Sequence, residues 1–426
     1  MSPEWLIVGG GIHGVHLAAR LIIEAGVQPD RLMIVDPADR LLDRWQSCTE
    51  VTGMQFLRSP AVHHLDIHHA SLQHYAGKTQ IRKTDGFAEP YARPALKLFN
   101  DHSYQLIQSL GLDALHKRDR AVSSKPHRSG VMVKLAREGW LEAQNVILAI
   151  GASEQPSWPD WAPRGHDRVH HIFDPGFSGW PTAEGEKVTV VGGGISAAQV
   201  ALRLAGQGHQ VRLVTRHEFR VHQFDSDPGW LGPRERVDFD RQKQTSRRRE
   251  IITDARHRGS IPPDVSLALR RALQEKKILW DQQGVKELFS GDEMLGVQFE
   301  DGRVMEADRV LLATGFSPVR PGGKFIDQLV DFADLPCAEC GFPIVDGGLK
   351  WHSRVRVTGP LAELEVGPVS RNIAGARIAG ERIVSTVKER SWKKSVKNSI
   401  SEVFKGGAGL LQARPKQTLQ SVRASG

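Results

Sequence analysis

Residues 5–14 read WLIVGGGIHG, a short apolar run that leads directly into three spaced glycines. An apolar run of this length before a turn predicts a buried strand, and the apolar positions between residues 12 and 25 recur at helical spacing. Gly26 follows them, and glycine suits the left-handed position that ends many helices. Residues 32–35 are again apolar. The segment therefore predicts a strand, a glycine turn, a helix and a parallel strand.

Gly9, Gly11 and Gly14 give the turn the spacing G-x-G-x-x-G. The first glycine permits the tight bend, the second lets a pyrophosphate approach the backbone, and the third lets the helix pack on the strand. Asp36 ends the second strand, where a carboxylate accepts hydrogen bonds from an adenosine ribose. Glycines alone would also suit a turn that binds nothing. The strand, the helix and the acid together predict a site for an adenine dinucleotide.

A second copy of this unit occupies residues 188–214, with Gly192, Gly194 and Ala197 at the corresponding positions. Its second strand ends in Thr-Arg-His at residues 215–217, without an acid. An acid would repel the 2′-phosphate of NADPH, whereas the guanidinium of Arg216 can pair with that phosphate. We therefore predict NADPH at this second site. The alternative is that Arg216 is an ordinary solvated arginine.

Two such units predict two parallel sheets, each closed by a later strand that ends in glycine, at Gly151 and Gly315. The prolines that follow both glycines are typical of hinges between domains. The predicted fold class is α/β, with a doubly wound Rossmann-type domain and a second Rossmann-type domain inserted into it. The expected domains are 1–160 with a helical insertion at 59–140, then the inserted domain 161–320, the second part of the first domain at 321–390, and a basic flexible tail at 391–426.

Composition limits the class of protein. Apolar residues make up 40% of the 426 and charged residues 25%, as in globular proteins. The net charge is +8, but seven basic residues and one acid lie within 391–426, so most of the charge is in the tail. We therefore expect no nucleic-acid partner. No apolar stretch approaches the ~20 residues of a membrane helix, and the three cysteines and the early first strand favour a cytoplasmic protein without a signal peptide.

The order of the motifs resembles that of flavoproteins with two dinucleotide-binding domains. The shared features are the N-terminal G-x-G-x-x-G, the inserted G-x-G-x-x-A and the strand end Ala-Thr-Gly-Phe at residues 313–316. Within that class the chain is most similar to FAD- and NADPH-dependent monooxygenases, especially the lysine- and ornithine-type N-hydroxylases and the flavin-containing monooxygenases. The resemblance covers roughly residues 1–390. It implies FAD in the first, divided domain and NADPH in the inserted one.

The resemblance also implies residues close to the flavin. Residues 53–59 are similar to a flavin-proximal motif of N-hydroxylases, which makes Gln55, Arg58 and Ser59 candidate catalytic residues. Residues 357–368 are similar to the last flavin contact of such enzymes, although a helix start there could also close the sheet without binding a ligand. Trp45 is close enough in sequence to reach the flavin or to belong to the core. The remaining implied cofactor contacts are Gly315, Gly359 and Gly367.

The implied reaction is a monooxygenation. NADPH would reduce the flavin, and a C4a-peroxyflavin would transfer oxygen from molecular oxygen to an amine or another nucleophilic small molecule. One alternative is an NADPH-dependent reductase that passes electrons to a disulfide or a protein carrier. Another is a dinucleotide-binding sensor without turnover. Neither the substrate nor the oligomeric state follows from the sequence.

Two further groups invite a functional interpretation. Cys337 and Cys340 have the spacing of a redox dithiol, but they lie far beyond Gly315, whereas redox cysteines of the similar disulfide reductases precede the second glycine motif or lie in the first domain. We therefore expect no dithiol chemistry. The other group is a histidine cluster for which we expect a helix, with His64 and His68 on one face, and no metal site because a third ligand is missing. Its members are His63, His64, His68 and His69.

Overall fold

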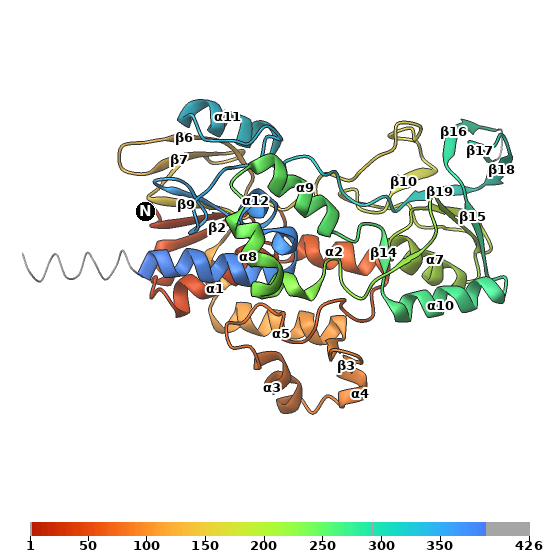
Figure 1. Ribbon diagram of the computed structural model, residues 1–426, viewed down its shortest axis with the longest axis horizontal. Coiled ribbons are helices and arrows are strands. Elements are labelled where there is room, and N and C mark those ends of the chain that lie inside the picture. The colour runs from red at the N-terminus through yellow and green to blue at the C-terminus, as the bar shows by residue number, and fades with distance from the viewer. Residues whose placement is uncertain (1, 292–293, 389–426) are drawn as a thin grey trace, which may run out of the picture.

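The computed structural model describes residues 2–291 and 294–388, and most of its strands form two separate sheets (Figure 1). The first sheet has the strand order β20-β21-β9-β1-β2-β5. At its centre, β1 (Trp5–Val8) pairs in parallel with β2 (Leu32–Asp36) and with β9 (Asn145–Leu148). All residues of β1 and β9 are buried, because a parallel sheet in the middle of a domain is covered on both faces. The outer strands are β5 (His116–Arg118), β20 (Lys350–His352) and β21 (Val355–Val357).

The predicted strand, turn, helix and strand are all present in the first unit. α1 (Ile12–Ile23) begins directly after the glycines, and Gly26 adopts a left-handed φ of 67° just beyond its end. A three-stranded antiparallel sheet and a helix pack into the same core. They are β6 (Ala121–Pro126), β7 (Val131–Leu135), β8 (Gly139–Ala143) and α11 (Gly323–Ala333).

The second sheet has the order β10-β19-β11-β12-β15, and all of its pairs are parallel. It is built around β11 (Lys187–Val191), α7 (Ile195–Gly206) and β12 (Gln210–Thr215), which are the elements predicted for the second unit. All strands of the second sheet therefore come from residues 169–312. Its remaining strands are β10 (Val169–His171), β15 (Ile278–Gln282) and β19 (Arg309–Leu312), and α10 (Pro263–Gln274) precedes β15. A separate three-stranded antiparallel sheet consists of β16 (Val285–Ser290), β17 (Leu295–Phe299) and β18 (Val304–Ala307).

The insertion predicted at 59–140 contains short helices as well as strands, and the histidine cluster lies outside its helices. Residues 61–70 form turns and bends, so His64 and His68 share no helix face. The side chain of Asp66 accepts a hydrogen bond from Ile67 N at 2.6 Å and another from Ser71, and such local bonds compete with a helix. The elements here are α2 (Asp43–Thr52), α3 (Ser71–Lys78), α4 (Lys83–Gly86), β3 (Phe87–Ala88), β4 (Arg93–Pro94), α5 (Leu96–Ser109) and α6 (Leu112–Leu115).

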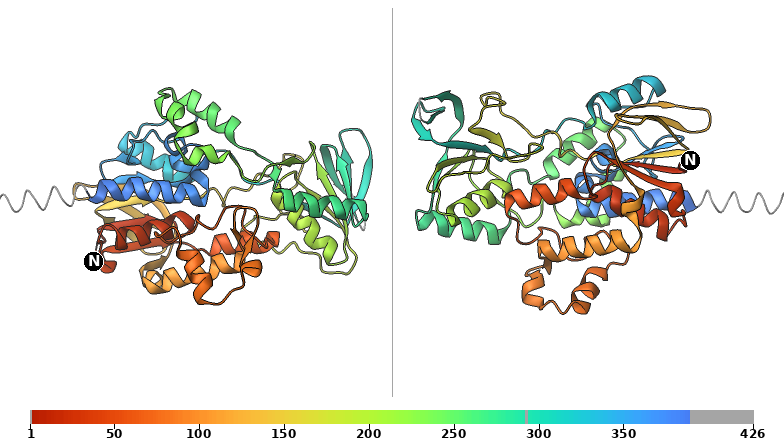
Figure 2. Two further views of the ribbon diagram at one scale, coloured as in Figure 1. Left: turned by 60° about the horizontal axis from the view of Figure 1, so that its bottom comes forward. Right: turned by 180° about the vertical axis from the view of Figure 1, so that it is seen from behind.

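Residues 216–263 form an excursion from the second sheet. Its two ends stay against the core of the second sheet through Phe219 and Ile261, whereas its middle part packs on the first unit. Trp230, Phe239 and Ile252 belong to the same core as β1 and α1, although the segment lies within the range assigned to the inserted domain. Figure 2 shows the corresponding helices lying over the first unit. The elements of this excursion are β13 (Arg220–Val221), α8 (Pro233–Arg241), α9 (Thr245–Ala255) and β14 (Ser260–Ile261).

The chain returns to the first sheet through β21 and then forms α12 (Glu363–Val366) and a helix over residues 373–388. The predicted basic flexible tail at 391–426 lies outside the described residues. Among the helices of residues 2–291 and 294–388, none has the length and apolar character needed to cross a membrane.

Candidate functional site

The first glycine turn has the geometry expected from its sequence. Gly9 adopts a φ of 114°, and a Cβ atom on it would lie 2.5 Å from the carbonyl oxygen of Ala149. A Cβ on Gly14 would lie 1.9 Å from the carbonyl oxygen of Gly9. Both positions therefore require glycine for the fold itself. At Gly11, in contrast, a Cβ would meet no heavy atom within 4 Å, so open space adjoins the backbone there.

This open space lies at the N-terminus of α1. The first turn of α1 contains no acidic residue, and no side chain caps it. Free N–H groups and the helix dipole both favour an anion at such a position. Gly11 and the start of α1 therefore fit the pyrophosphate of FAD.

Asp36 stands at the end of β2, beside the glycine turn. Its Oδ2 accepts a hydrogen bond from Gly10 N at 2.6 Å, and its Oδ1 accepts one from Ala38 N at 2.9 Å. Each carboxylate oxygen can accept a further bond. The geometry therefore leaves acceptor capacity for a ribose hydroxyl.

Gly359 lies next to the first glycine turn, as the resemblance implies. Its φ is 65°, and a Cβ on it would lie 3.8 Å from the ring of His13, which belongs to α1. His13 Nδ1 is 2.8 Å from Oγ1 of Thr358. Burial lowers the pKa of His13 to about 4, so the ring is neutral at physiological pH. The carboxyl end of β21 and the start of α1 thus meet at one place.

Gly367 lies elsewhere. Its N–H donates to the carbonyl of Glu363 at 2.9 Å and so closes α12. A Cβ on Gly367 would lie 3.6 Å from Trp230 and 3.7 Å from Phe239, both in the excursion. The Gly367 amide, implied as a cofactor contact, is therefore already engaged within α12.

Trp45 and the segment 55–59 make mainly structural contacts. Trp45 donates from Nε1 to Oδ1 of Asn100 at 3.0 Å. The Gln55 side chain is exposed, and Ser59 is half-buried. The guanidinium of Arg58 donates to three backbone carbonyls of the excursion and to Oγ of Ser260. The Arg58 guanidinium is therefore already engaged, although it was a candidate catalytic group.

The second glycine turn repeats the first in most respects. Gly192 adopts a φ of 151°, and a Cβ on it would lie 2.4 Å from the carbonyl oxygen of Ala313. Gly194 precedes α7, and Ala197 is buried inside that helix. The difference is at Gly194, because a Cβ there would lie 3.5 Å from Cα of Gly259. The second turn is therefore covered where the first is open.

Arg216 follows β12 at the edge of this turn, and its side chain is exposed. Within the part of the chain that the structure describes, the Arg216 guanidinium has no hydrogen bond and no ion pair. By contrast, Thr215 beside it donates to the carbonyl of His217 at 2.8 Å. The Arg216 guanidinium is thus available to an anionic ligand.

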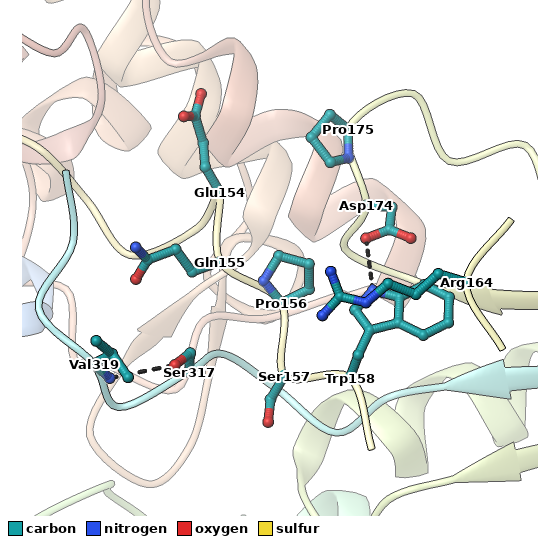
Figure 3. Close-up of a pocket in the computed structure, with 10 residues that line it drawn as sticks. All are labelled: Glu154, Gln155, Pro156, Ser157, Trp158, Arg164, Asp174, Pro175, Ser317 and Val319. Carbon is teal, nitrogen blue, oxygen red and sulfur yellow. Dashed lines mark hydrogen bonds between the residues drawn. The ribbon is translucent and has the colours of Figure 1, made fainter. Parts of the chain in front are cut away.

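The two sheets are connected where β9 and β19 end. Oγ1 of Thr314 donates to the carbonyl of Ser157 at 2.5 Å, and Ser157 N donates to Gly315 at 2.9 Å. A cavity of about 540 Å³ opens beside this junction (Figure 3). In its wall Trp158 donates to Asp174 at 3.2 Å, and the guanidinium of Arg164 lies 5.6 Å from the centre of the Trp158 ring. Gly315 therefore lies at the junction of the two sheets. It is joined to the two glycine turns only through the connecting segments.

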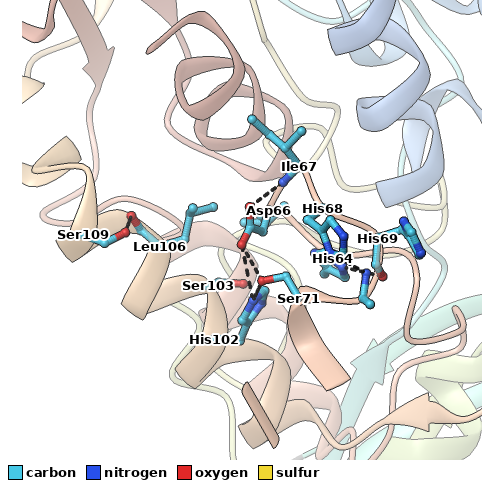
Figure 4. A network of polar contacts seen from close by, with 12 residues as sticks. His64, Asp66, Ile67, His68, His69, Ser71, His102, Ser103, Leu106 and Ser109 are labelled. Atoms are coloured by element: carbon cyan, nitrogen blue, oxygen red, sulfur yellow. Dashed lines mark hydrogen bonds and ion pairs between the residues drawn. The ribbon is translucent and has the colours of Figure 1, made fainter. Parts of the chain in front are cut away.

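The histidine cluster adjoins a buried polar network that the sequence did not reveal (Figure 4). Ser71 donates to Asp66, and its Oγ is 2.9 Å from Nε2 of His102. Both neighbours thus converge on the hydroxyl, whereas a nucleophilic triad would place the histidine between the serine and the acid. Among the described residues no group of histidine, cysteine and acidic side chains could hold a metal ion.

All three cysteines are free, and none lies in a glycine turn. Cys48 is in α2 and packs toward the core of the second sheet, where burial raises the pKa of its thiol. Burial also raises the pKa of Cys337, while Cys340 is exposed. A raised pKa keeps a thiol protonated and weakly nucleophilic.

The sequence analysis missed a buried ion cluster beneath the excursion. Glu363 is fully buried and pairs with Arg249, with Arg256 at 2.8 Å and with Arg371 at 2.7 Å. Burial by itself would raise the pKa of Glu363, but the neighbouring guanidinium groups lower it to about 2. The available signal was an acid inside the apolar stretch 357–369, where only a paired charge is tolerated.

Two family models match parts of the chain. A model described as FAD-NAD(P)-binding matches residues 6–153, and a model described as pyridine nucleotide-disulphide oxidoreductase matches residues 120–256. The chain is also similar to the uncharacterized oxidoreductase CzcO of Bacillus velezensis, with 24% identity over 242 residues. That match covers 56% of this chain and 66% of the relative, slightly less than two thirds of its length.

Two solved structures share the fold over most of the chain. One is FAD-bound DfoA, a cadaverine monooxygenase of the desferrioxamine biosynthetic pathway of Erwinia amylovora, with a TM-score of 0.69, 15% identity, and coverage of 91% of this chain and 95% of that one. The other is the bacillithiol disulfide reductase Bdr (YpdA) of Bacillus cereus, with a TM-score of 0.60, 16% identity, and coverage of 92% and 100%. At these identities the likeness is one of fold, and one fold serves both reactions.

Proposed function

Since the chain is a flavoprotein with two dinucleotide-binding domains, an oxidoreductase that uses FAD and NAD(P), we propose that it is an NADPH-dependent monooxygenase. Its substrate would be an amine or another nucleophilic small molecule, and its oxidant molecular oxygen. The cadaverine monooxygenase that shares the fold supports this substrate class. The free cysteines support a cytoplasmic setting.

The residues of the two turns fit the two cofactors. Gly9, Gly11, Gly14 and Asp36 would hold FAD, with Gly359 at the side of the same turn. Gly192, Gly194 and Ala197 would hold NADPH, and Arg216 would select its 2′-phosphate. When bound, FAD accepts a hydride from NADPH and activates oxygen. The protein would then orient both cofactors and exclude water, with no protein nucleophile required.

The placement of the cysteines is the observation that carries the proposal. A flavoprotein disulfide reductase that works through a dithiol needs two cysteines within reach of the flavin. Here Cys340 is exposed, and Cys337 is half-buried beyond the end of α11. Cys48 lies on the opposite side, against the second sheet. No cysteine pair adjoins either glycine turn, which favours oxygen as the acceptor of the electrons.

The proposal is tested by following the electrons. Purified protein would be reduced with NADPH without oxygen, and oxygen would then be admitted with cadaverine, lysine or ornithine present. We expect flavin reduction first, then oxygen consumption that a good substrate accelerates and couples to a hydroxylated product. Oxygen consumption that yields only hydrogen peroxide with every amine would contradict the amine substrate class.

The disulfide-reductase alternative rests on the family model that matches residues 120–256 and on the fold of Bdr. The discriminating assay is NADPH oxidation without oxygen, with a low-molecular-weight disulfide as acceptor. Sustained turnover under those conditions would favour the reductase. A protein that binds FAD but does not oxidise NADPH, whichever acceptor is added, would instead be a sensor.

A further inference from the structure

The two glycine turns of this chain differ in what adjoins the second glycine. In this motif that glycine lacks a side chain because the pyrophosphate occupies the space where a Cβ would be. At Gly11 the space is open, whereas at Gly194 it is in van der Waals contact with Cα and the carbonyl carbon of Gly259, at 3.5 and 3.9 Å. Gly259 therefore stands where the pyrophosphate of a nicotinamide dinucleotide would lie.

The loop that carries Gly259 is well fixed over the turn. Residues 257–260 connect α9 to β14, and Gly259 has a left-handed φ of 68°. The ring of His217 fills the remaining gap, because a Cβ on Gly193 would lie 2.8 Å from it and a Cβ on Gly259 would lie 3.2 Å from it. We call residues 257–260 the covering loop.

Arg58 of the first unit holds the covering loop and the strand beside it. Its Nη2 donates to Oγ of Ser260 at 2.8 Å, and that hydroxyl donates to the carbonyl of His257 at 2.6 Å. The same guanidinium donates to backbone carbonyls of residues 222–224, at 2.7 Å to His222, 2.7 Å to Gln223 and 2.8 Å to Phe224. Bonds from a charged donor are stronger than neutral ones, so this side chain is one tie between the first unit and the loop. A second tie lies just before the loop, where the guanidinium of Arg256 donates to Pro368 and to Glu363.

We propose that Arg58 is a positioning residue that keeps the covering loop over the second glycine turn, so that a nicotinamide dinucleotide binds only when the loop moves away. The inference rests on the proposed function, because it assumes that the second turn binds the dinucleotide. It assigns a role to Arg58 that differs from flavin chemistry. Arg58 belongs to the first unit, which would bind FAD. Its bonds to the covering loop therefore link the FAD site to the nicotinamide dinucleotide site.

We call the covering loop, held closed by Arg58, the gate. It predicts the direction in which the affinity for NADP⁺ changes when the loop is released. If only the fraction of molecules with an open loop binds the dinucleotide, the apparent Kd is the intrinsic Kd divided by that fraction. Arg58→Lys keeps the charge but cannot span the separate acceptors, so it should open the loop and lower the Kd for NADP⁺ at least threefold. Ser260→Ala removes one bond of Arg58 and also the bond from Ser260 to the carbonyl of His257. We expect a smaller decrease in Kd, because the bonds of Arg58 to residues 222–224 remain. A merely structural arginine would give the opposite sign, because a loosened site binds more weakly.

A second measurement uses the unaltered holoenzyme. Arg258 precedes Gly259 and is exposed, so trypsin can report whether the covering loop is displaced. We expect saturating NADP⁺ to accelerate cleavage after Arg258, because the loop must leave the turn. Protection by NADP⁺ would mean that the loop closes on the ligand, and the gate would be refuted.

The outcomes separate this inference from the proposed function. Calorimetry that detects no NADP⁺ binding to the wild-type protein, to Arg58→Lys or to Ser260→Ala would refute both the dinucleotide site and the gate. NADP⁺ binding that is weaker or unchanged in both variants, or a protected loop, would refute the gate and leave the site intact.

Discussion

At the scale of single residues, a substitution at Gly11 should affect cofactor binding but not folding. Its φ of −79° is open to any residue, and nothing lies within 4 Å of where a Cβ would be. A Gly11→Val protein should therefore fold, with an unfolding free energy lowered by about 1 kcal/mol or less through the poorer N-cap. The valine would fill the space of the pyrophosphate, so the protein should lose its FAD. The flavin-to-protein ratio from the absorbance spectrum measures the loss.

Gly14→Ala is the matched control for that variant. Its Cβ would lie 1.9 Å from the carbonyl oxygen of Gly9, so the turn or the helix must shift. We expect poor folding, seen as a lower Tm or insoluble protein, rather than a folded apoprotein. Full flavin occupancy in Gly11→Val would contradict the assignment of this turn.

Arg216 carries the prediction of cofactor preference. Its guanidinium has no partner among the described residues, so Arg216→Ala should leave the fold unchanged. A charge-assisted bond to a 2′-phosphate is worth about 1.5 to 3 kcal/mol, which corresponds to a roughly 10- to 150-fold higher Michaelis constant for NADPH. The constant for NADH should barely change. Steady-state kinetics with both cofactors checks this, and added salt should reduce the difference.

Equal losses with NADPH and NADH would show that Arg216 supports the site in general. A wild-type preference for NADH would overturn the interpretation of the strand end at residues 215–217.

At the scale of elements, the excursion is held to the first unit by buried charge. Glu363 in α12 is the centre of this contact, with arginines from α9 and from the following turn around it. Replacing one partner of a buried pair leaves the other charges uncompensated, which costs about 3–5 kcal/mol. Glu363→Gln should lower the unfolding free energy by that amount, measured by urea denaturation at pH 7. The neighbouring Glu365→Gln, whose carboxylate is partly exposed, should cost about 1 kcal/mol or less.

The same carboxylate predicts a pH dependence with a definite sign. The pKa of Glu363 is about 2 in the folded protein, below its ordinary value of 4.5. A lowered pKa stabilises the fold above pH 4.5, and the contribution disappears as the pH falls through about 2. Wild-type stability should thus fall more steeply than that of Glu363→Gln between pH 5 and pH 2. Parallel curves for the two proteins would mean that Glu363 is not held as a charged group.

The elements that could be predicted are those whose signal is local. Periodicity and glycine spacing located α1, α7 and the strands around them because each element follows from neighbouring residues. The packing of α9 on α12 could not be predicted, because it depends on arginines and an acid more than 100 residues apart. The helix predicted for the histidine cluster was wrong for a related reason. The side-chain hydrogen bonds of Asp66 favour a turn there, although the histidines have helical spacing. Nothing in the sequence near the second glycine motif indicated that residues 257–260 would cover Gly194.

At the scale of the whole molecule, the two main sheets meet where β9 and β19 end, and ligands of open α/β sheets bind beyond the carboxyl ends of the parallel strands. Each glycine turn lies at the carboxyl end of the central strand of its own sheet, β1 or β11, which the sequence motifs already indicated. The sequence did not indicate that α2 and the excursion bridge the two units. Arg44 of α2 shows this, because it donates to Ser153 at 2.5 Å and to Phe173 in the two connecting segments.

The route of the electrons through the molecule gives the last prediction. If hydride passes from NADPH to the flavin and then to oxygen, no thiol takes part, and the cysteine pair beyond α11 is not needed for turnover. Cys337→Ser with Cys340→Ser should therefore keep flavin reduction and turnover within about threefold of the wild-type rates. Stopped-flow reduction by NADPH and steady-state oxygen consumption measure the two steps separately. A loss beyond tenfold, or about 1.4 kcal/mol in the barrier, would place a dithiol on the route and favour the reductase. Cys48→Ser is the control for general destabilisation, because Cys48 is the more buried thiol and its pKa is raised by burial.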